Sequence, residues 1–294
     1  MNWRDFGVLV AICAVWAVNN ITSKIIVGPL DIPPLAYAAA RFAVVGLCML
    51  PWLLPAPKPL WKVLLLAQLI GGANFALMFI GLQTATPSAV AVVLQVGVPM
   101  TILISMIFLR EQVGWRRALG IALTLSGALL VMWDPHGFQL SAGLLFVAAA
   151  CLTYSIGAVM LKTMEIKPMQ LQAWVGFASF WPLLILSAWL EPNAIPAIQA
   201  HWLAFAAAVL FSALIVSVVC HTLFYGLIQR YDASLLQPIT LITPLLTIAL
   251  GVAFLHDPFD ARLAIGSAIA LAGVLIIVIR LGHLAPLLAL RSRT

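Results

Sequence analysis

The chain has 294 residues, of which 64% are hydrophobic and only 8% are charged. A typical soluble domain is about 45–50% apolar and about 25% charged, so this chain has too few polar side chains to cover a surface that faces water. The composition therefore excludes an ordinary soluble protein and predicts an integral membrane protein. The net charge of +6 comes without a basic run or a basic face with interleaved aromatic residues, which argues against nucleic acid as a partner.

Apolar segments long enough to cross a bilayer follow one another along the chain. A hydrocarbon core about 30 Å thick needs about 20 apolar residues in a helix. Ten segments meet this requirement, and short connections rich in turn-forming residues join them. They span approximately residues 6–26, 34–54, 61–82, 88–109, 115–133, 141–162, 169–190, 202–228, 234–255 and 261–281. The sequence thus predicts an all-α integral membrane protein with ten transmembrane helices.

The basic residues indicate how these helices are oriented. With the N-terminus inside the cell, 12 of the 15 Lys and Arg residues lie at cytoplasmic ends, Lys24 and Arg262 lie at outer ends, and Arg41 lies within the second span. Because Lys and Arg concentrate in cytoplasmic loops, we expect both termini to be cytoplasmic, with a short tail at residues 283–294. Lys24 and Lys162, near opposite interfaces, are expected to snorkel.

The two halves of the chain resemble each other at an offset of 146 residues. The matching pairs are Ser88 and Ser234, Leu109 and Leu255, Glu111 and Asp257, Arg116 and Arg262, Gly120 and Gly266, and Gly127 and Gly273. Each half holds five predicted helices, an odd number, so the halves must enter the membrane in opposite orientations. We expect a first repeat over residues 1–135 and an inverted second repeat over residues 136–282. Inverted repeats are typical of secondary transporters, in which a central site opens to each side in turn.

Several motifs resemble those of the EamA-type ten-helix exporters of the drug/metabolite transporter superfamily. The residues that carry this resemblance are Trp16-x2-Asn19-x4-Lys24, the Arg41-Phe42 pair, Leu109-Arg-Glu111, Gly120-x6-Gly127, Pro244, Asp257 and Gly266-x6-Gly273. The second half departs from the pattern with His256-Asp257-Pro258 where glycine-glutamate is usual, and with Tyr154 where tryptophan is common. The resemblance implies a bacterial inner-membrane exporter of amino acids, aromatic ones among them, or of related metabolites. It does not choose the substrate.

Polar side chains and prolines within the apolar spans form the candidate substrate site. A substrate with amino and carboxylate groups needs polar partners away from water. The candidates for substrate binding are Trp16, Asn19, Asn20, Asn74, Met78, Gln95, Pro99, Tyr154, Ser155, His221, Tyr225, Gln237, Thr240 and Pro244. Prolines at matching places in the fourth and ninth helices point to a transporter site, although such kinks can also serve packing alone. Asn74 and Gln95 can equally form hydrogen bonds between helices.

Arg41 is the one basic residue inside a predicted span, about a turn and a half from its end. An arginine in a membrane helix is costly and is usually functional or paired. Two interpretations remain open from the sequence. The side chain either snorkels to the nearby interface or serves as a gate or polar anchor, where it would contact an anionic group of the substrate.

No Asp or Glu lies in the middle of a predicted span, whereas many proton-coupled carriers place a carboxylate there. This favours facilitated or gradient-driven export by alternating access. The alternative is a proton-coupled metabolite or drug antiporter that uses His221, the one candidate whose ordinary pKa lies in the middle range, about a turn from the inner end of the eighth predicted span.

Enzymes, metals and cofactors are not expected. The five histidines are far apart in sequence, and the chain has neither an HExxH motif nor a nucleophile–base pattern, which argues against catalysis. The four cysteines include no CxxC pair, so no metal site is expected. The expected partners are a small-molecule substrate and the lipid bilayer. The sequence leaves the oligomeric state open, a monomer included.

Overall fold

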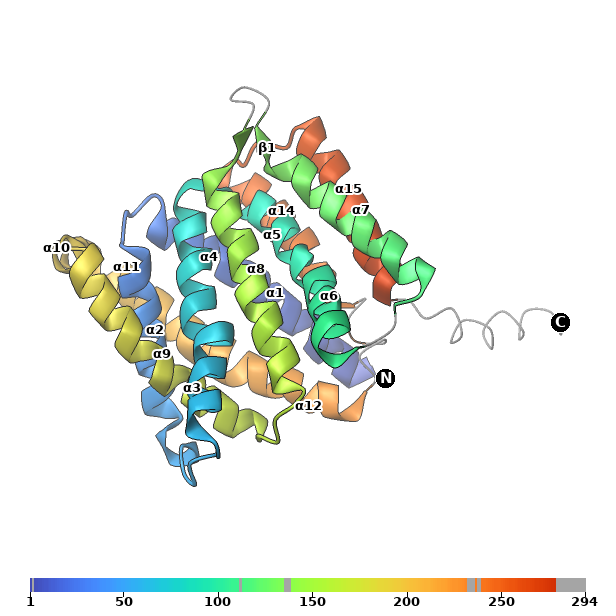
Figure 1. Ribbon diagram of the computed structural model, residues 1–294. Helices are drawn as coiled ribbons and strands as arrows, with labels where there is room; N and C mark the ends of the chain where they lie inside the picture. Colours follow the sequence, from blue (N-terminus) through green and yellow to red (C-terminus); the bar gives the residue numbers. More distant parts are fainter. Residues whose placement is uncertain (2, 111–112, 135–138, 232–235, 237–238, 279–294) are drawn as a thin grey trace.

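A computed structural model of the chain describes residues 1, 3–110, 113–134, 139–231, 236 and 239–278, without the side chains of residues 134, 139, 225 and 228–230. The described residues form a bundle of helices (Figure 1). Two short strands, β1 (Trp133–Asp134) and β2 (Gln139–Leu140), pair antiparallel at one end of the bundle. Glu111, Ser234, Gln237 and the expected tail at residues 283–294 lie outside the described residues.

The helices of the first half of the chain are α1 (Trp3–Val27), α2 (Pro34–Cys48), α3 (Leu60–Ala67), α4 (Ala73–Thr84), α5 (Pro87–Val93), α6 (Gly97–Leu109) and α7 (Trp115–Met132). Short 3-10 turns lie at η1 (Leu50–Trp52) and η3 (Leu94–Val96), and a π-helical segment, η2 (Gln68–Gly72), joins α3 to α4. The second half contains α8 (Ala142–Leu161), α9 (Pro168–Leu190), α10 (Ala194–Ala200), α11 (Trp202–Leu210), α12 (His221–Arg230), α14 (Ile242–Leu255) and α15 (Ala261–Val278). A second π-helical segment, η4 (Phe211–Cys220), joins α11 to α12.

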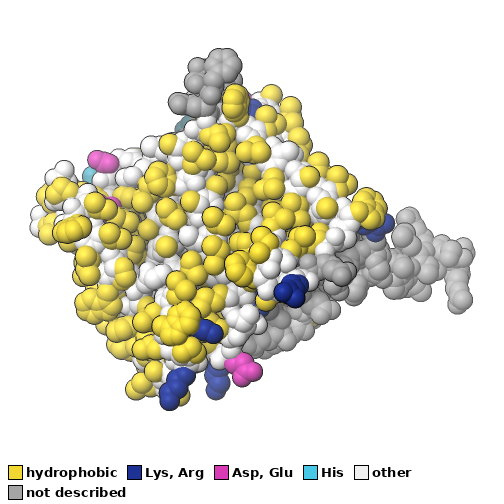
Figure 2. Space-filling model, viewed as in Figure 1, with side chains coloured by type: hydrophobic (Ala, Val, Ile, Leu, Met, Phe, Trp, Pro, Cys, Tyr) yellow, Lys and Arg dark blue, Asp and Glu magenta, His cyan; other side chains and the backbone are white. Residues whose placement is uncertain are grey.

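Eight helical runs among the described residues are long and apolar enough to cross a membrane. They are Trp3–Val27, Leu60–Thr84, Pro87–Leu109, Trp115–Met132, Ala142–Leu161, Pro168–Leu190, Trp202–Phe224 and Ala261–Val278. Figure 2 shows the matching surface, a broad area of hydrophobic side chains with Lys and Arg gathered mainly toward its lower edge. The prediction of an all-α membrane protein with many spans is confirmed.

Two further apolar helices are shorter than the sequence predicts. α2 has 15 residues and α14 has 14. At 1.5 Å per residue, α2 is about 22 Å long, which falls short of a hydrocarbon core about 30 Å thick. The expected span over residues 34–54 ends at Cys48 and passes into the 3-10 turn that contains Pro51, which lacks a backbone donor to continue the α-helix. The count of ten spans therefore stays a prediction.

α7 and α15 lie side by side along their length (Figure 1) because glycines bring their backbones together. A Cβ atom on Gly127 would lie 2.5 Å from the backbone nitrogen of Ala270 and 2.6 Å from the carbonyl oxygen of Gly266. A Cβ atom on Gly273 would lie 2.5 Å from the backbone nitrogen of Thr124. Helices in lipid associate mainly through such close packing, because lipid tails are as apolar as the side chains. The glycines found in the sequence thus form the contact between these two helices.

Close contacts at glycines also join two other helix pairs. A Cβ atom on Gly176 of α9 would lie 2.6 Å from the Gly46 nitrogen of α2, and one on Gly81 of α4 would lie 2.6 Å from the Gly143 oxygen of α8. These contacts hold α2 against α9 and α4 against α8. The polar residues described below lie between the helices that these contacts position.

Aromatic side chains fill the core between α2 and α4. The ring of Tyr37 lies 5.0 Å from that of Phe79, and the ring of Phe75 lies 5.4 Å from that of Phe42 and 5.7 Å from that of Phe79. Tyr37, Phe42 and Phe79 are at most 2% exposed. This cluster forms an apolar wall beside the one buried arginine of α2.

The glycine contact between α7 and α15 can be tested by a single methyl group. Gly127→Ala places a Cβ atom against the backbone of α15, and overpacking of this kind lowers the free energy of unfolding by about 1–3 kcal/mol. We therefore expect a lower thermal unfolding temperature for the detergent-solubilised variant, followed by tryptophan fluorescence.

Gly7→Ala is the matched control, because Gly7 lies in α1 with no atom within 4 Å of its added Cβ. Alanine is favoured over glycine in a helix by about 0.5–1 kcal/mol, so this variant should unfold at the wild-type temperature or slightly above it. Equal unfolding temperatures for the two variants would contradict the proposed packing role of Gly127.

Candidate functional site

One face of α1 carries polar side chains into the interior of the bundle. Trp16, Asn19 and Ser23 are spaced by three and four residues, so they lie on one side of the helix. Trp16 Nε1, Asn19 Oδ1 and Ser23 Oγ are buried and have no hydrogen-bond partner among the described residues. Buried polar atoms are nearly always hydrogen-bonded in folded proteins. This face of α1 therefore offers donors and acceptors that the described residues leave unused.

Two of the predicted site residues meet through this face. The Trp16 ring lies 5.7 Å from that of His221 and 5.1 Å from that of Phe224, both on α12. The residue after Asn19 on α1, Asn20, donates from its side-chain nitrogen to Thr247 Oγ1 of α14 at 3.2 Å. The site thus joins α1, α12 and α14, which are far apart in sequence. Ser23 and Thr247 were absent from the sequence candidates, although each lies one helical turn from a polar residue of the same helix.

Arg41 lies inside the bundle rather than at its surface. Its side chain is 1% exposed, and its guanidinium carbon lies 4.3 Å from the centre of the Phe75 ring. The Nε and Nη2 atoms donate to Ser217 Oγ of η4 at 3.3 Å and 2.9 Å. His221 follows one helical turn after Ser217, at the start of α12. Arg41 therefore connects α2 and α4 to the helix that carries His221.

The guanidinium of Arg41 has no acidic partner among the described residues, and its Nη1 atom has no hydrogen-bond partner. Taking a charge from water into an apolar interior costs several kcal/mol unless an opposite charge and hydrogen bonds offset it. The Phe75 ring returns roughly 0.5–2 kcal/mol through its negative face. A buried cation with an open donor edge is the electrostatic feature that sets this site apart from ordinary helix packing.

Other predicted residues serve contacts between helices. The Asn74 side-chain nitrogen donates to the Ala150 carbonyl at 2.8 Å, which joins α4 to α8. Ser155 Oγ donates to the Gly97 carbonyl at 3.1 Å and accepts from Thr101 Oγ1 at 3.0 Å, which joins α8 to α6. These bonds satisfy polar groups within lipid and are of the kind worth about 0.6–2 kcal/mol.

The remaining predicted residues are spread over the bundle. Met78 is packed in the apolar core at 7% exposure, and Pro99 and Pro244 are buried in α6 and α14. Gln95 is half-buried in η3, and Thr240 is half-buried. Tyr154 lies at the surface of α8 with 50% exposure. The Tyr225 side chain and Gln237 lie outside the described residues, so their placement in the site stays a prediction.

Lys24, for which the sequence predicts snorkelling, binds the end of a neighbouring helix. Its Nζ atom donates to the carbonyl oxygens of Leu82 at 2.7 Å and Gln83 at 3.0 Å. Cations at a helix C-terminus satisfy carbonyls that lack a partner and complement the negative end of the helix dipole. The charge of Asp257 interacts with that of Lys24. The Oδ2 atom of Asp257 accepts from Ser88 N at 3.0 Å and from Ser88 Oγ at 2.6 Å.

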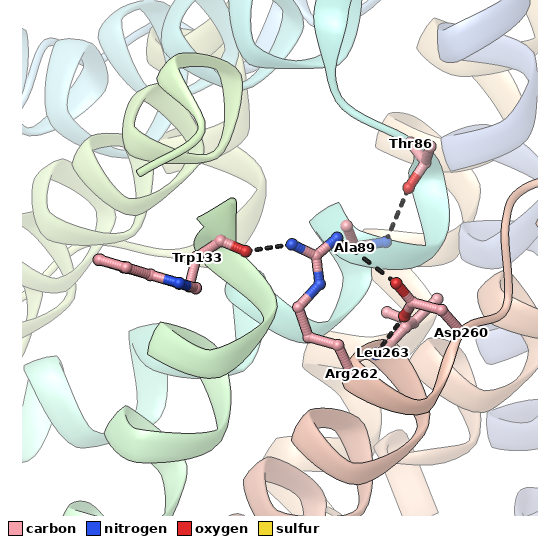
Figure 3. Close-up of polar contacts among 6 residues, drawn as sticks. All are labelled: Thr86, Ala89, Trp133, Asp260, Arg262 and Leu263. Atoms are coloured by element: carbon pink, nitrogen blue, oxygen red, sulfur yellow. Dashed lines mark hydrogen bonds and ion pairs between the residues drawn. The ribbon is translucent and has the colours of Figure 1, made fainter. Parts of the chain in front are cut away.

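A cavity of about 420 Å³ lies at this same end of the bundle. Figure 3 shows Arg262 of α15 between the carbonyl of Trp133, to which it donates, and Asp260, whose carboxylate lies 3.6 Å from Arg262 Nη2. Asp260 also accepts from the backbone of Leu263 at 2.7 Å. Arg262 and Asp260 line the cavity, and both are at least a third exposed. The charges here are paired, in contrast to the buried charge of Arg41.

The sequence profile of the EamA-like transporter family matches residues 5–133 and again residues 141–279. A "Probable amino-acid metabolite efflux pump" of Escherichia coli is 24% identical over 286 residues, and one of Salmonella typhimurium is 23% identical; each alignment covers 94% of this chain and 95% of the relative.

A solved crystal structure resembles the bundle with a TM-score of 0.61 and 20% sequence identity, over 99% of this chain and 98% of the other. At this identity the likeness concerns the fold. The family profile covers far more than half of the sequence in two consecutive matches, which agrees with the many apolar spans of the structure. This chain belongs to the EamA-like transporter family.

Proposed function

We propose that this protein exports amino acids, or closely related small metabolites, across the bacterial cytoplasmic membrane. The buried polar cluster carries this proposal, since Arg41, Trp16 and Asn19 leave donors and acceptors unused inside an otherwise apolar bundle. A binding site for a zwitterion needs such atoms in a region shielded from water. The two efflux-pump relatives, whose alignments cover 94% of this chain, support the same substrate class.

The transport cycle that fits this chain best is alternating access between two inverted five-helix repeats. The repeat is supported by the offset of 146 residues in the sequence and by the two consecutive matches of the family profile. The close contact of α7 with α15 pairs the fifth predicted helix of each half through the matched glycines. In this proposal the chain crosses the membrane ten times, with α2 and α14 as its shortest spans.

The proposed orientation places both termini in the cytoplasm. Most Lys and Arg residues then lie on the cytoplasmic side, as in other membrane proteins. Arg262, Asp260 and the cavity that they line would face the outside. The protein is proposed to act as a carrier and not as an enzyme, and without a cofactor.

Loss of a single unused acceptor tests the proposed site. Overexpression should let cells tolerate higher levels of at least one toxic amino acid or analogue among aromatic, sulfur-containing and hydroxyl compounds. Asn19→Ala removes a buried acceptor, and losing one such hydrogen bond to a substrate costs about 1–3 kcal/mol. We therefore expect a drop in transport rate of about fivefold or more, with normal amounts of folded protein in the membrane.

The matched control is Asn193→Ala, since Asn193 is exposed before the first residue of α10 and makes no side-chain capping bond. This variant should export at the wild-type rate. A wild-type rate for Asn19→Ala would remove that residue from the site, and absence of any tolerance phenotype across the three classes of compound would count against the proposed substrate class.

Proton coupling through His221 is the second candidate mechanism, favoured by the contact of His221 with Trp16 at 5.7 Å. We expect facilitated export, because the spans hold no mid-membrane carboxylate to carry a proton. An imposed pH gradient should then change flux from proteoliposomes by less than about twofold, a ratio that corresponds to under 0.5 kcal/mol. Strong acceleration by the gradient that disappears in His221→Gln would establish the proton-coupled alternative instead.

A further inference from the structure

The hydrogen bonds of Arg41 leave one edge of the guanidinium without a partner among the described residues. A guanidinium carries five N–H donors in a rigid plane. Two nitrogens, Nε and Nη2, converge on the single oxygen of Ser217, while Phe75 covers one flat face. Nη1 is buried without a partner. The open edge consists of Nη1 and the second N–H of Nη2, which are the two parallel donors that a carboxylate accepts in a bidentate pair.

Two ordinary explanations for a membrane arginine do not fit this one. A snorkelling arginine reaches the interface, but Arg41 is 1% exposed. A structural arginine in a protein interior is commonly paired with an acid, but no acid among the described residues forms an ion pair with Arg41. The contact with Ser217 uses only part of the donor set, and a neutral amide side chain could donate to the same oxygen. The positive charge itself is left without a structural partner.

We propose that Arg41 binds the carboxylate of the transported substrate, an inference that rests on the export function proposed above. Arg41 is linked to α1 through one helical run, because its partner Ser217 lies one turn before His221, whose ring is 5.7 Å from that of Trp16. Asn19, on the same face of α1 as Trp16, holds a buried acceptor without a donor. An open cationic donor and an open acceptor match the carboxylate and the ammonium group of an amino acid.

The charge of the site favours a monocarboxylate over a phosphate or a dicarboxylate. Arg41 is the one Lys or Arg residue buried in the described part of the bundle. A dianion in an apolar interior would keep one charge uncompensated, which the low dielectric penalises. Amines that lack a carboxylate would leave the guanidinium unpaired, so they should be poor substrates even when their side chains are identical to those of a transported amino acid.

Transport in proteoliposomes tests this inference with matched compounds. The compounds are L-phenylalanine, L-methionine and L-threonine, each beside its amide, which keeps the side chain and amino group but has no carboxylate charge. For the wild type we expect at least tenfold faster transport of at least one amino acid than of its amide. Arg41→Gln keeps a donor for Ser217 without the charge, and it should reduce this preference to less than twofold. An unchanged preference in Arg41→Gln would overturn the proposal.

Arg116→Gln is the matched control. Arg116 lies over the ring of Trp115 at the exposed start of α7, outside the proposed site, so the variant should keep the wild-type preference. If Arg41→Gln does not fold, Arg41→Lys replaces it, because a lysine keeps the charge but not the planar fork. In that variant the ratio of amino-acid transport to amide transport should be at least threefold lower than in the wild type. A ratio equal to that of the wild type would overturn the bidentate contact.

A binding measurement separates the role of Arg41 from the transport function. Benzoate and benzamide differ in the charged carboxylate but have the same ring and nearly the same shape. Benzoate should raise the unfolding temperature of the detergent-solubilised wild type more than benzamide does, and this difference should vanish in Arg41→Gln but persist in Arg116→Gln. If no amino acid is transported but the benzoate effect depends on Arg41, the proposed export function fails and the anion site stands. If benzoate has no effect on the wild type, or an equal effect on Arg41→Gln, the anion site fails.

Discussion

A positive charge that is buried without an acidic partner among the described residues is the constraint on which the interior of this protein depends. The guanidinium of Arg41 lies between the aromatic wall of α2 and α4 and the π-helical segment η4. Phe75 and Ser217 offset part of the cost of burying it, but they supply no opposite charge. An anion that bound to this guanidinium would supply the missing charge and would therefore stabilise the bundle.

Each π-helical segment packs against the second long helix of the other half of the chain. The segment η2 lies against α9, and η4 lies against α2. A π segment opens the regular hydrogen-bond pattern of a helix and is frequent at functional sites. In lipid, the freed backbone groups must be satisfied by neighbours. In η2, the backbone nitrogen of Gly72 donates to Ser179 Oγ of α9 at 2.9 Å. In η4, Ser217 Oγ donates to the Ser212 carbonyl at 3.0 Å while it accepts from Arg41. A serine hydroxyl therefore satisfies a backbone group in both π segments. The hydroxyl at η4 also binds Arg41, whereas the hydroxyl at η2 belongs to Ser179 of α9.

The sequence predicted those features that depend on one helix at a time. Apolar length identified the spans, and the repeated glycines of α7 and α15 lie at the contact between them. The sequence led us to extend the second span past Cys48 because residues 49–54 stay apolar, although Pro51 is a signal for the end of the α-helix. It also did not show that Lys24 binds the carbonyls of α4, because a neighbouring helix end and the membrane interface offer a lysine equally suitable partners.

The candidate site was predicted in part, for a physical reason. A polar side chain in lipid is satisfied equally well by a carbonyl of the next helix or by a substrate, so residue type does not distinguish Asn74, which binds Ala150, from Asn19, which leaves Oδ1 unused. The face that each residue presents depends on how the helices are packed. For that reason Trp16 and His221, on α1 and α12, could be named separately but not placed in contact.

The central claim is that a substrate site is exposed to each side of the membrane in turn, and counterflow tests it most directly. Vesicles that contain the purified protein are loaded with an unlabelled amino acid that the protein exports and are diluted into a trace of the labelled compound. A carrier should transiently accumulate label inside the vesicles above its outside concentration, because each return of the carrier brings in a labelled molecule. Simple equilibration of the label without any overshoot would contradict it and would indicate a channel.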